Sequence, residues 1–213
     1  MDIIAKDENV TIKKLVQKPY DTNAYILICA KTNNSVLIDA PSDAESIIEA
    51  LHGTSPQYIL LTHSHTDHTG ALEEIRRKLR VPLAMNSADS ANILPTPEIL
   101  LNDGDTLSFG EIILKVLHTP GHTPGGLCFR FGKYFISGDT IFPGGPGMTW
   151  SADGFSQIIK SITEKVFTLP DDTLIYPGHG IHSILKKEKA EYAVFTSGHR
   201  KQNFYGQVTW LPQ

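Results

Sequence analysis

Residues 62–70 read Thr-His-Ser-His-Thr-Asp-His-Thr-Gly, and this segment constrains the fold more than any other part of the chain. It directly follows the short apolar run 58–61, which is typical of a buried strand. In an extended chain alternate side chains point the same way, so we expect His63, His65 and Asp67 on one side. Imidazoles and a carboxylate that converge inside a fold are costly to desolvate unless a cation binds them. The segment therefore predicts a metal site at the end of a central strand.

Three further segments end predicted strands with small, turn-forming residues, and each carries one more candidate ligand. Glycine and proline let the backbone turn sharply and come close to a bound group. One such segment alone is weak evidence, whereas all of them in one chain indicate a shared site. The segments are His-Thr-Pro-Gly-His-Thr-Pro-Gly at 118–125, Ser-Gly-Asp-Thr at 137–140 and Tyr-Pro-Gly-His-Gly at 176–180, and their candidate ligands are His122, Asp139 and His179.

The rest of the chain alternates short apolar runs with amphipathic stretches. The patterns predict strands at 10–16, 24–29, 36–38, 58–61, 106–109, 111–117, 127–131, 134–136 and 174–176, and helices at 43–51, 71–79, 155–167 and 186–193. This interleaving by itself favours an α/β or α+β fold. No shift in composition marks a linker, so we expect one domain that spans residues 1–213.

Three groups of residues outside the motifs admit simpler interpretations. The last helix alternates lysines with Glu188 and Glu191, which predicts a solvated face. Phe142, Trp150 and Phe155 either line a pocket beside the metals or pack a loop. His118 either ends a strand or supports the nearby His122, while we expect the remaining histidines, His52, His182 and His199, at the surface.

Composition and charge exclude several classes of partner. The formal net charge of −4 gives no sign of binding to nucleic acid or to an anionic membrane. No apolar run approaches the ~18 residues that a membrane span requires. The N-terminus lacks the apolar core of a secretory signal, so we expect a cytoplasmic protein. Cys29 and Cys128 lie inside apolar runs and are expected to be reduced core residues.

Taken together, the motifs resemble those of the metallo-β-lactamase superfamily from about Asn23 to Gly180. The Thr-His-x-His-x-Asp-His-x-x-Gly motif at 62–70 carries this resemblance, and Thr-Pro-Gly-His-Thr-Pro-Gly at 119–125 is most similar to the glyoxalase II-like (hydroxyacylglutathione hydrolase-like) branch. The resemblance implies an α+β fold, an αββα four-layer sandwich of two mixed sheets flanked by helices. It also implies a site at one edge, between the two sheets.

The same resemblance implies two divalent metal ions. The first would be bound by His63, His65 and His122, the second by Asp67, His68 and His179, and Asp139 would bridge both. Imidazole and carboxylate together favour zinc, iron or manganese over calcium or magnesium, and we expect zinc.

The implied activity is hydrolysis of a small thioester, lactone or related ester through a metal-bound hydroxide. Asp67 is the expected catalytic residue, since it would orient the nucleophile beside its role as a ligand. One alternative is persulfide dioxygenase-like sulfur oxidation with one iron at His63, His122 and Asp139. Another is nuclease-type phosphodiester hydrolysis, which the acidic balance disfavours. We expect a small-molecule substrate as the partner.

Two departures from the glyoxalase II-like pattern concern the substrate. Only 34 residues follow His179, and we expect them to leave no room for the helical region that recognises glutathione in full-length glyoxalase II proteins. Met148 also stands where an arginine is expected, which removes a planar, permanently charged group. Both departures disfavour a glutathione thioester.

Overall fold

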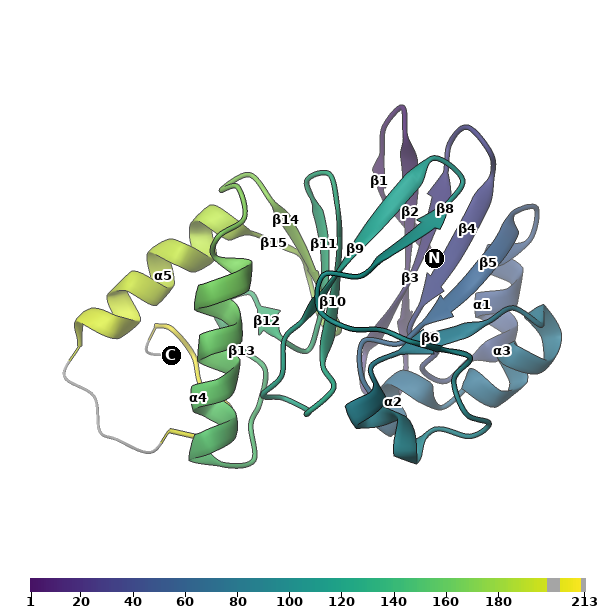
Figure 1. The fold of residues 1–213 in the computed structure, drawn as a ribbon. Coiled ribbons are helices and arrows are strands. Elements are labelled where there is room, and N and C mark those ends of the chain that lie inside the picture. The colour runs from purple at the N-terminus through teal and green to yellow at the C-terminus, as the bar shows by residue number, and fades with distance from the viewer. Residues whose placement is uncertain (199–203, 212–213) are drawn as a thin grey trace.

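Two β-sheets lie face to face in the computed structural model, and helices cover the outer face of each (Figure 1). The structure describes residues 1–198 and 204–211, without the side chain of Asn92. This arrangement confirms the four-layer αββα sandwich expected from the sequence. His199 lies outside the described residues.

The first sheet is mixed and contains the N-terminal strands in sequence order. β1 to β4 pair antiparallel, and β4 to β7 pair parallel. β3 is buried along its whole length, because one face packs on helices and the other on the second sheet. The strands are β1 (Asp2–Lys6), β2 (Val10–Gln17), β3 (Thr22–Cys29), β4 (Asn34–Ile38), β5 (Ser55–Leu60), β6 (Leu83–Met85) and β7 (Ile99–Leu100).

The second sheet has the order β15-β14-β11-β10-β9-β8 and is antiparallel except for the pair β11–β14. Its strands are β8 (Thr106–Phe109), β9 (Ile112–His118), β10 (Leu127–Phe131), β11 (Tyr134–Gly138), β14 (Leu174–Pro177) and β15 (Ser183–Ile184). A separate short hairpin pairs β12 (Ile141–Phe142) with β13 (Gly145–Pro146). Every strand predicted from the sequence is present, with bounds that shift by three residues at most.

The helices form the two outer layers. α1 (Ala44–Leu51) and α3 (Leu72–Leu79) pack on the first sheet, while α4 (Ala152–Ser161), its π-helical continuation η2 (Ile162–Val166) and α5 (Leu185–Ser197) pack on the second. The single turn α2 (Thr66–Thr69) and the 3-10 helix η1 (Ser87–Asn92) lie in loops. α4 begins at Ala152, before the predicted start at 155, because the Ser151 side chain caps it by accepting from the Gly154 amide.

Three hydrophobic cores separate these layers, one between the sheets and one under each helical layer. Cys29 and Cys128 are buried and free, which confirms their expected place in the core. Trp210 is completely buried and packs against Tyr192 and Phe195 of α5. The segment 204–211 is thereby attached to the second helical layer.

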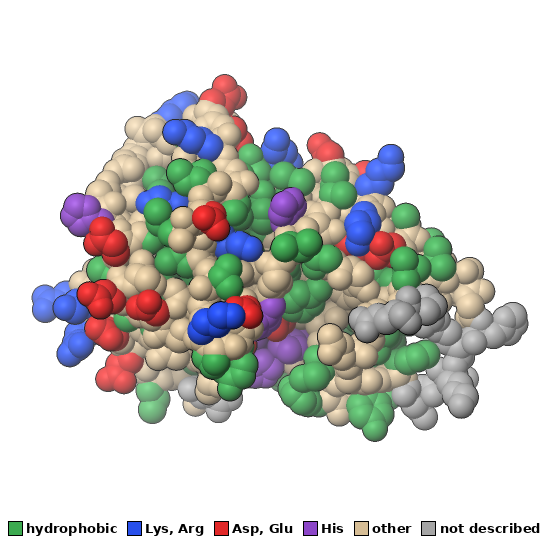
Figure 2. Space-filling view, turned by 180° about the vertical axis from the view of Figure 1, so that it is seen from behind, with side chains coloured by type: hydrophobic (Ala, Val, Ile, Leu, Met, Phe, Trp, Pro, Cys, Tyr) green, Lys and Arg blue, Asp and Glu red, His purple; other side chains and the backbone are tan. Residues whose placement is uncertain are grey.

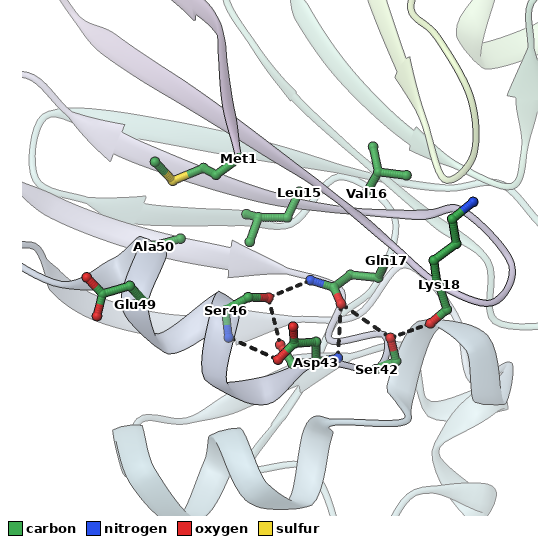
Figure 3. A pocket seen from close by; sticks show the side chains of 10 residues that line it. All are labelled: Met1, Leu15, Val16, Gln17, Lys18, Ser42, Asp43, Ser46, Glu49 and Ala50. Atoms are coloured by element: carbon green, nitrogen blue, oxygen red, sulfur yellow. Dashed lines mark hydrogen bonds between the residues drawn. The ribbon is translucent and has the colours of Figure 1, made fainter.

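A cavity of about 600 Å³ lies where β2 meets the start of α1 (Figure 3). The Gln17 amide spans it, because its Nε2 donates to Ser46 Oγ at 2.8 Å and its Oε1 accepts from the Asp43 amide at 3.0 Å. These hydrogen bonds join β2 to the start of α1 beside the cavity.

Among the described residues, no helix combines the length and the hydrophobicity needed to cross a membrane.

Candidate metal centre

Seven ionisable side chains meet at one edge of the sandwich, where β5, β9, β11 and β14 end. His63 and His65 follow β5, and Asp67 and His68 lie on α2. The remaining three follow the other strands: His122 follows β9, Asp139 follows β11 and His179 follows β14. In Figure 2 a group of histidines lies in the lower middle of the face, with hydrophobic side chains around it. The structure brings together every metal-site residue predicted from the sequence: His63, His65, Asp67, His68, His122, Asp139 and His179.

The first cluster contains His63, His65 and His122. His63 Nε2 lies 3.1 Å from His65 Nδ1, and His122 Nε2 lies 3.0 Å from the same atom. His63 and His122 are buried, while His65 is half-buried and faces a pocket. Three ring nitrogens therefore converge on one point.

The second cluster contains Asp67, His68 and His179. His179 Nε2 lies 3.2 Å from Asp67 Oδ2 and 3.3 Å from His68 Nε2. The extended conformation expected for residues 63–67 is wrong for Asp67, because residues 66–69 form the helical turn α2. The turn separates Asp67 from His63 and His65 and brings it to His68 and His179.

Asp139 lies between the two clusters. Its Oδ2 is 3.5 Å from both His122 Nε2 and His179 Nε2, and its Oδ1 is 3.4 Å from His68 Nε2. Oδ1 is buried and accepts no hydrogen bond from any described residue. A buried carboxylate oxygen without a donor is costly. A cation between the two clusters would satisfy it.

The outward nitrogens of three histidines are held by acceptors. His68 Nδ1 donates to Asp39 Oδ2 at 2.8 Å, His122 Nδ1 to the Met148 carbonyl at 2.7 Å and His179 Nδ1 to the Tyr20 carbonyl at 3.0 Å. A neutral imidazole that donates from Nδ1 has its lone pair on Nε2. In its neutral form, each ring therefore directs its Nε2 lone pair into the centre, as metal ligation requires.

Charge is strongly coupled across the two clusters. Burial alone would raise the pKa of Asp139, but His68 and His179 outweigh it and hold that pKa well below its ordinary value. Burial would lower the pKa of His68, yet Asp39 and Asp139 raise it to about 10. Burial and the neighbouring His68 lower the pKa of His63. Such mutual shifts in a cleft are typical of a functional site.

The donor set fits divalent metal ions. Imidazole nitrogens and carboxylate oxygens suit zinc, iron or manganese, and the two clusters share one carboxylate.

Gly178 also has a role here, because a Cβ atom at this position would overlap Asp139 Oδ1 and lie 2.7 Å from His68 Cε1. The close approach of the backbone therefore requires glycine at residue 178.

Asp39 is a site residue that the sequence motifs missed. It is buried just after β4, and its carboxylate accepts from the Thr62 amide, from Thr62 Oγ1 and from His68 Nδ1, each at 2.8 Å. Asp89 similarly accepts from the Gly125 amide at 2.7 Å and the Ser64 amide at 3.3 Å, which connects the loop after β5 with the loop after β9. The only sequence signal for either is a lone aspartate near a loop.

A pocket of about 930 Å³ opens onto the centre. Phe142 and Trp150 line this pocket, which agrees with one of the two interpretations that the sequence allowed. Phe155 does not line the pocket and packs against Phe204. The Met148 side chain also lines the pocket. The wall around the metal-site residues is thus largely apolar.

The other histidines lie away from the centre. His118 Nε2 contacts the Pro124 carbonyl at 2.9 Å, so His118 supports the loop that carries His122. Among the described residues, the hydrogen bonds of the His122 ring go to the Met148 carbonyl and to His65, and not to His118. His52 and His182 are exposed, as predicted.

Comparison with known proteins agrees with the geometry. The family model described as Metallo-beta-lactamase superfamily matches residues 18–179. The probable metallo-hydrolase YqgX of Bacillus subtilis is 35% identical over 76% of this chain and 86% of its own length. The hydroxyacylglutathione hydrolase of Photorhabdus laumondii is 32% identical over 78% of this chain and 66% of its own length. The crystal structure of BLEG-1 B3 metallo-beta-lactamase superposes with a TM-score of 0.74 at 28% identity, over 84% of this chain and 96% of that one.

The chain therefore belongs to the metallo-beta-lactamase superfamily, and its relatives support the glyoxalase II-like branch. Family membership and the cluster of donors together support a metal-dependent hydrolase.

Proposed function

We propose that this protein is a binuclear metal-dependent hydrolase that cleaves a small thioester, lactone or related ester. The observation that carries the proposal is Asp139, whose Oδ2 lies 3.5 Å from His122 Nε2 of the first cluster and from His179 Nε2 of the second, while its Oδ1 lies 3.4 Å from His68 Nε2 of the second. One carboxylate therefore lies within reach of both clusters, and this shared position favours two ions over one.

His63, His65 and His122 would hold the first ion, Asp67, His68 and His179 the second, and Asp139 both. Zinc suits these donors best, and iron or manganese are compatible with them. When bound, such ions activate water as a nucleophile and polarise a substrate carbonyl.

The protein groups prepare the reaction around the ions. Asp67 lines the pocket, and its Oδ2 accepts from Thr22 Oγ1 at 3.4 Å and lies 3.2 Å from His179 Nε2. This fixed carboxylate can orient an attacking water and accept its proton. The carbonyls of Met148 and Tyr20 keep His122 and His179 in the ligating tautomer.

The pocket favours a small apolar acyl group. Phe142, Met148, Trp150 and Ile181 form its apolar walls, and recognition of the carboxylates of glutathione would require placed cations. Met148 occupies the position where glutathione-handling relatives are expected to carry an arginine.

A substrate panel tests this proposal. The metal-loaded protein should cleave simple thioesters or lactones with a kcat/KM at least equal to that for S-lactoylglutathione, and a chelator should abolish turnover. A preference for the glutathione thioester of about a hundredfold, or ~2.7 kcal/mol in transition-state binding, would restore a glyoxalase II assignment.

The panel also includes the competing reactions. A phosphodiester tests for nuclease activity, and a persulfide with measurement of oxygen consumption tests for sulfur oxidation. A β-lactam tests for the activity in the name of the BLEG-1 structure. Turnover of any of these above the thioesters and lactones would contradict the proposal.

A further inference from the structure

Glu188 is completely buried, so the solvated face predicted for its helix is wrong at this position. It lies in the first turn of α5 and points inward. Its Oε2 accepts from the Gly144 amide at 2.8 Å, and its Oε1 accepts from Ser183 Oγ and from Lys187 Nζ at 3.1 Å. A buried carboxylate is stable only with such donors.

The Gly144 amide belongs to the hairpin β12–β13, which forms part of the pocket wall. Pro143 and Gly144 form its turn, and the φ of Gly144 is +85°, as a type II turn with proline followed by glycine requires. On the first strand Phe142 stacks on the His179 ring, with centroids 6.3 Å apart and planes at 30°. The position of this hairpin therefore determines the space above the second cluster.

The hairpin is too short to hold this position by itself. It has only two cross-strand pairs, Ile141 with Pro146 and Phe142 with Gly145, and isolated two-stranded hairpins are marginal. Both backbone groups of Gly144 are held from outside, since Glu188 accepts from its amide and Trp210 N donates to its carbonyl at 2.7 Å. The hairpin thus depends on α5 and on segment 204–211.

We propose that Glu188 is a positioning residue for substrate binding, which fixes the hairpin β12–β13 through the Gly144 amide and so determines the acyl groups that fit. The role in binding rests on the proposed function of the pocket. A buried ionic group is weak evidence for stability, because replacement of a whole buried ion pair by apolar side chains of similar volume is often neutral or stabilising for a fold. The presence of a carboxylate at residue 188 is therefore explained better by its contact with the pocket hairpin than by a contribution to the stability of the fold.

Two substitutions of similar length separate this role from a general effect on packing. Glu188→Gln keeps an acceptor oxygen for the Gly144 amide, whereas Glu188→Met fills the same space without one. Hydrogen exchange followed by mass spectrometry reports on the hairpin without any substrate. In Glu188→Met we expect peptides that cover residues 141–148 to exchange at least about tenfold faster, and in Glu188→Gln within about threefold of the parent.

Kinetics with the best substrate of the panel supply the second readout. Glu188→Met should raise KM at least about tenfold, with kcat within about threefold and the metal content unchanged, because the hairpin contacts the substrate without ligating metal. Ser183→Ala is the matched control, since it removes another donor to the same carboxylate but leaves the Gly144 contact. It should resemble the parent in both readouts.

Equal exchange of the hairpin in the Met and Gln variants would overturn the proposal, as would equal KM values with a shared fall in Tm. A parent that cleaves nothing in the panel contradicts the proposed function and the role in binding, while the exchange comparison still decides whether Glu188 holds the hairpin.

Discussion

Asp139→Ala is expected to abolish turnover and to lower the metal content of both clusters. The loss in kcat/KM should reach the order of 10³-fold or more, the upper range for removal of one electrostatic group from an active site. The reason is geometric, because Asp139 lies within 3.5 Å of ring nitrogens from both clusters. His65→Ala, by contrast, removes one of three ligands from a single cluster and should cost less.

Elemental analysis and kinetics on the same samples decide this prediction. Asp153→Ala is a suitable control, because Asp153 is an exposed aspartate on α4. Intact metal content in Asp139→Ala, with activity within about tenfold of the parent, would show that Asp139 does not bridge.

Asp39→Asn should weaken the second metal ion selectively. With its oxygen on the Thr62 amide, the asparagine would place its NH₂ group at His68 Nδ1, where Asp39 now accepts a hydrogen bond. His68 would then donate from Nε2 and lose its lone pair toward the metal. We expect a loss of about 10- to 100-fold in affinity for that ion, the usual effect of removing the partner of a ligand histidine.

The backbone does not complicate the Asp39→Asn test. Asp39 has a φ of +61°, a conformation that asparagine also adopts readily. Asp43→Asn is the control, because Asp43 caps α1 and asparagine caps helices equally well. A metal titration in which Asp39→Asn binds both ions within about threefold of the parent would exclude this role for Asp39.

The predicted ligands came together because their segments share one local design. Each follows a strand, and glycine or proline at 120–121, 138 and 177–178 turns the chain at the same edge of the sandwich. Strand ends and turn chemistry are local properties, so the sequence carries them. The four-layer order of the sheets, by contrast, followed from the resemblance and not from periodicity.

Residues that act through tertiary contacts were not predictable in this way. Asp39 is a single aspartate after a strand, a pattern shared with ordinary turns, and its three donors come from residues 62 and 68. Glu188 has the charged neighbours of a surface helix, and its burial shows only in tertiary contacts such as the one with the Gly144 amide. The strands β6, β7, β12, β13 and β15 have two or three residues each, too few for a periodic signal.

The central claim is that one chain holds two metal ions, and elemental analysis after expression in metal-supplemented medium measures this directly. We expect about two ions per chain, as the shared carboxylate of a two-metal site implies. We also expect His68→Ala and His179→Ala each to lower that number. A reproducible single equivalent, unchanged when His68 or His179 is replaced, would contradict the binuclear account.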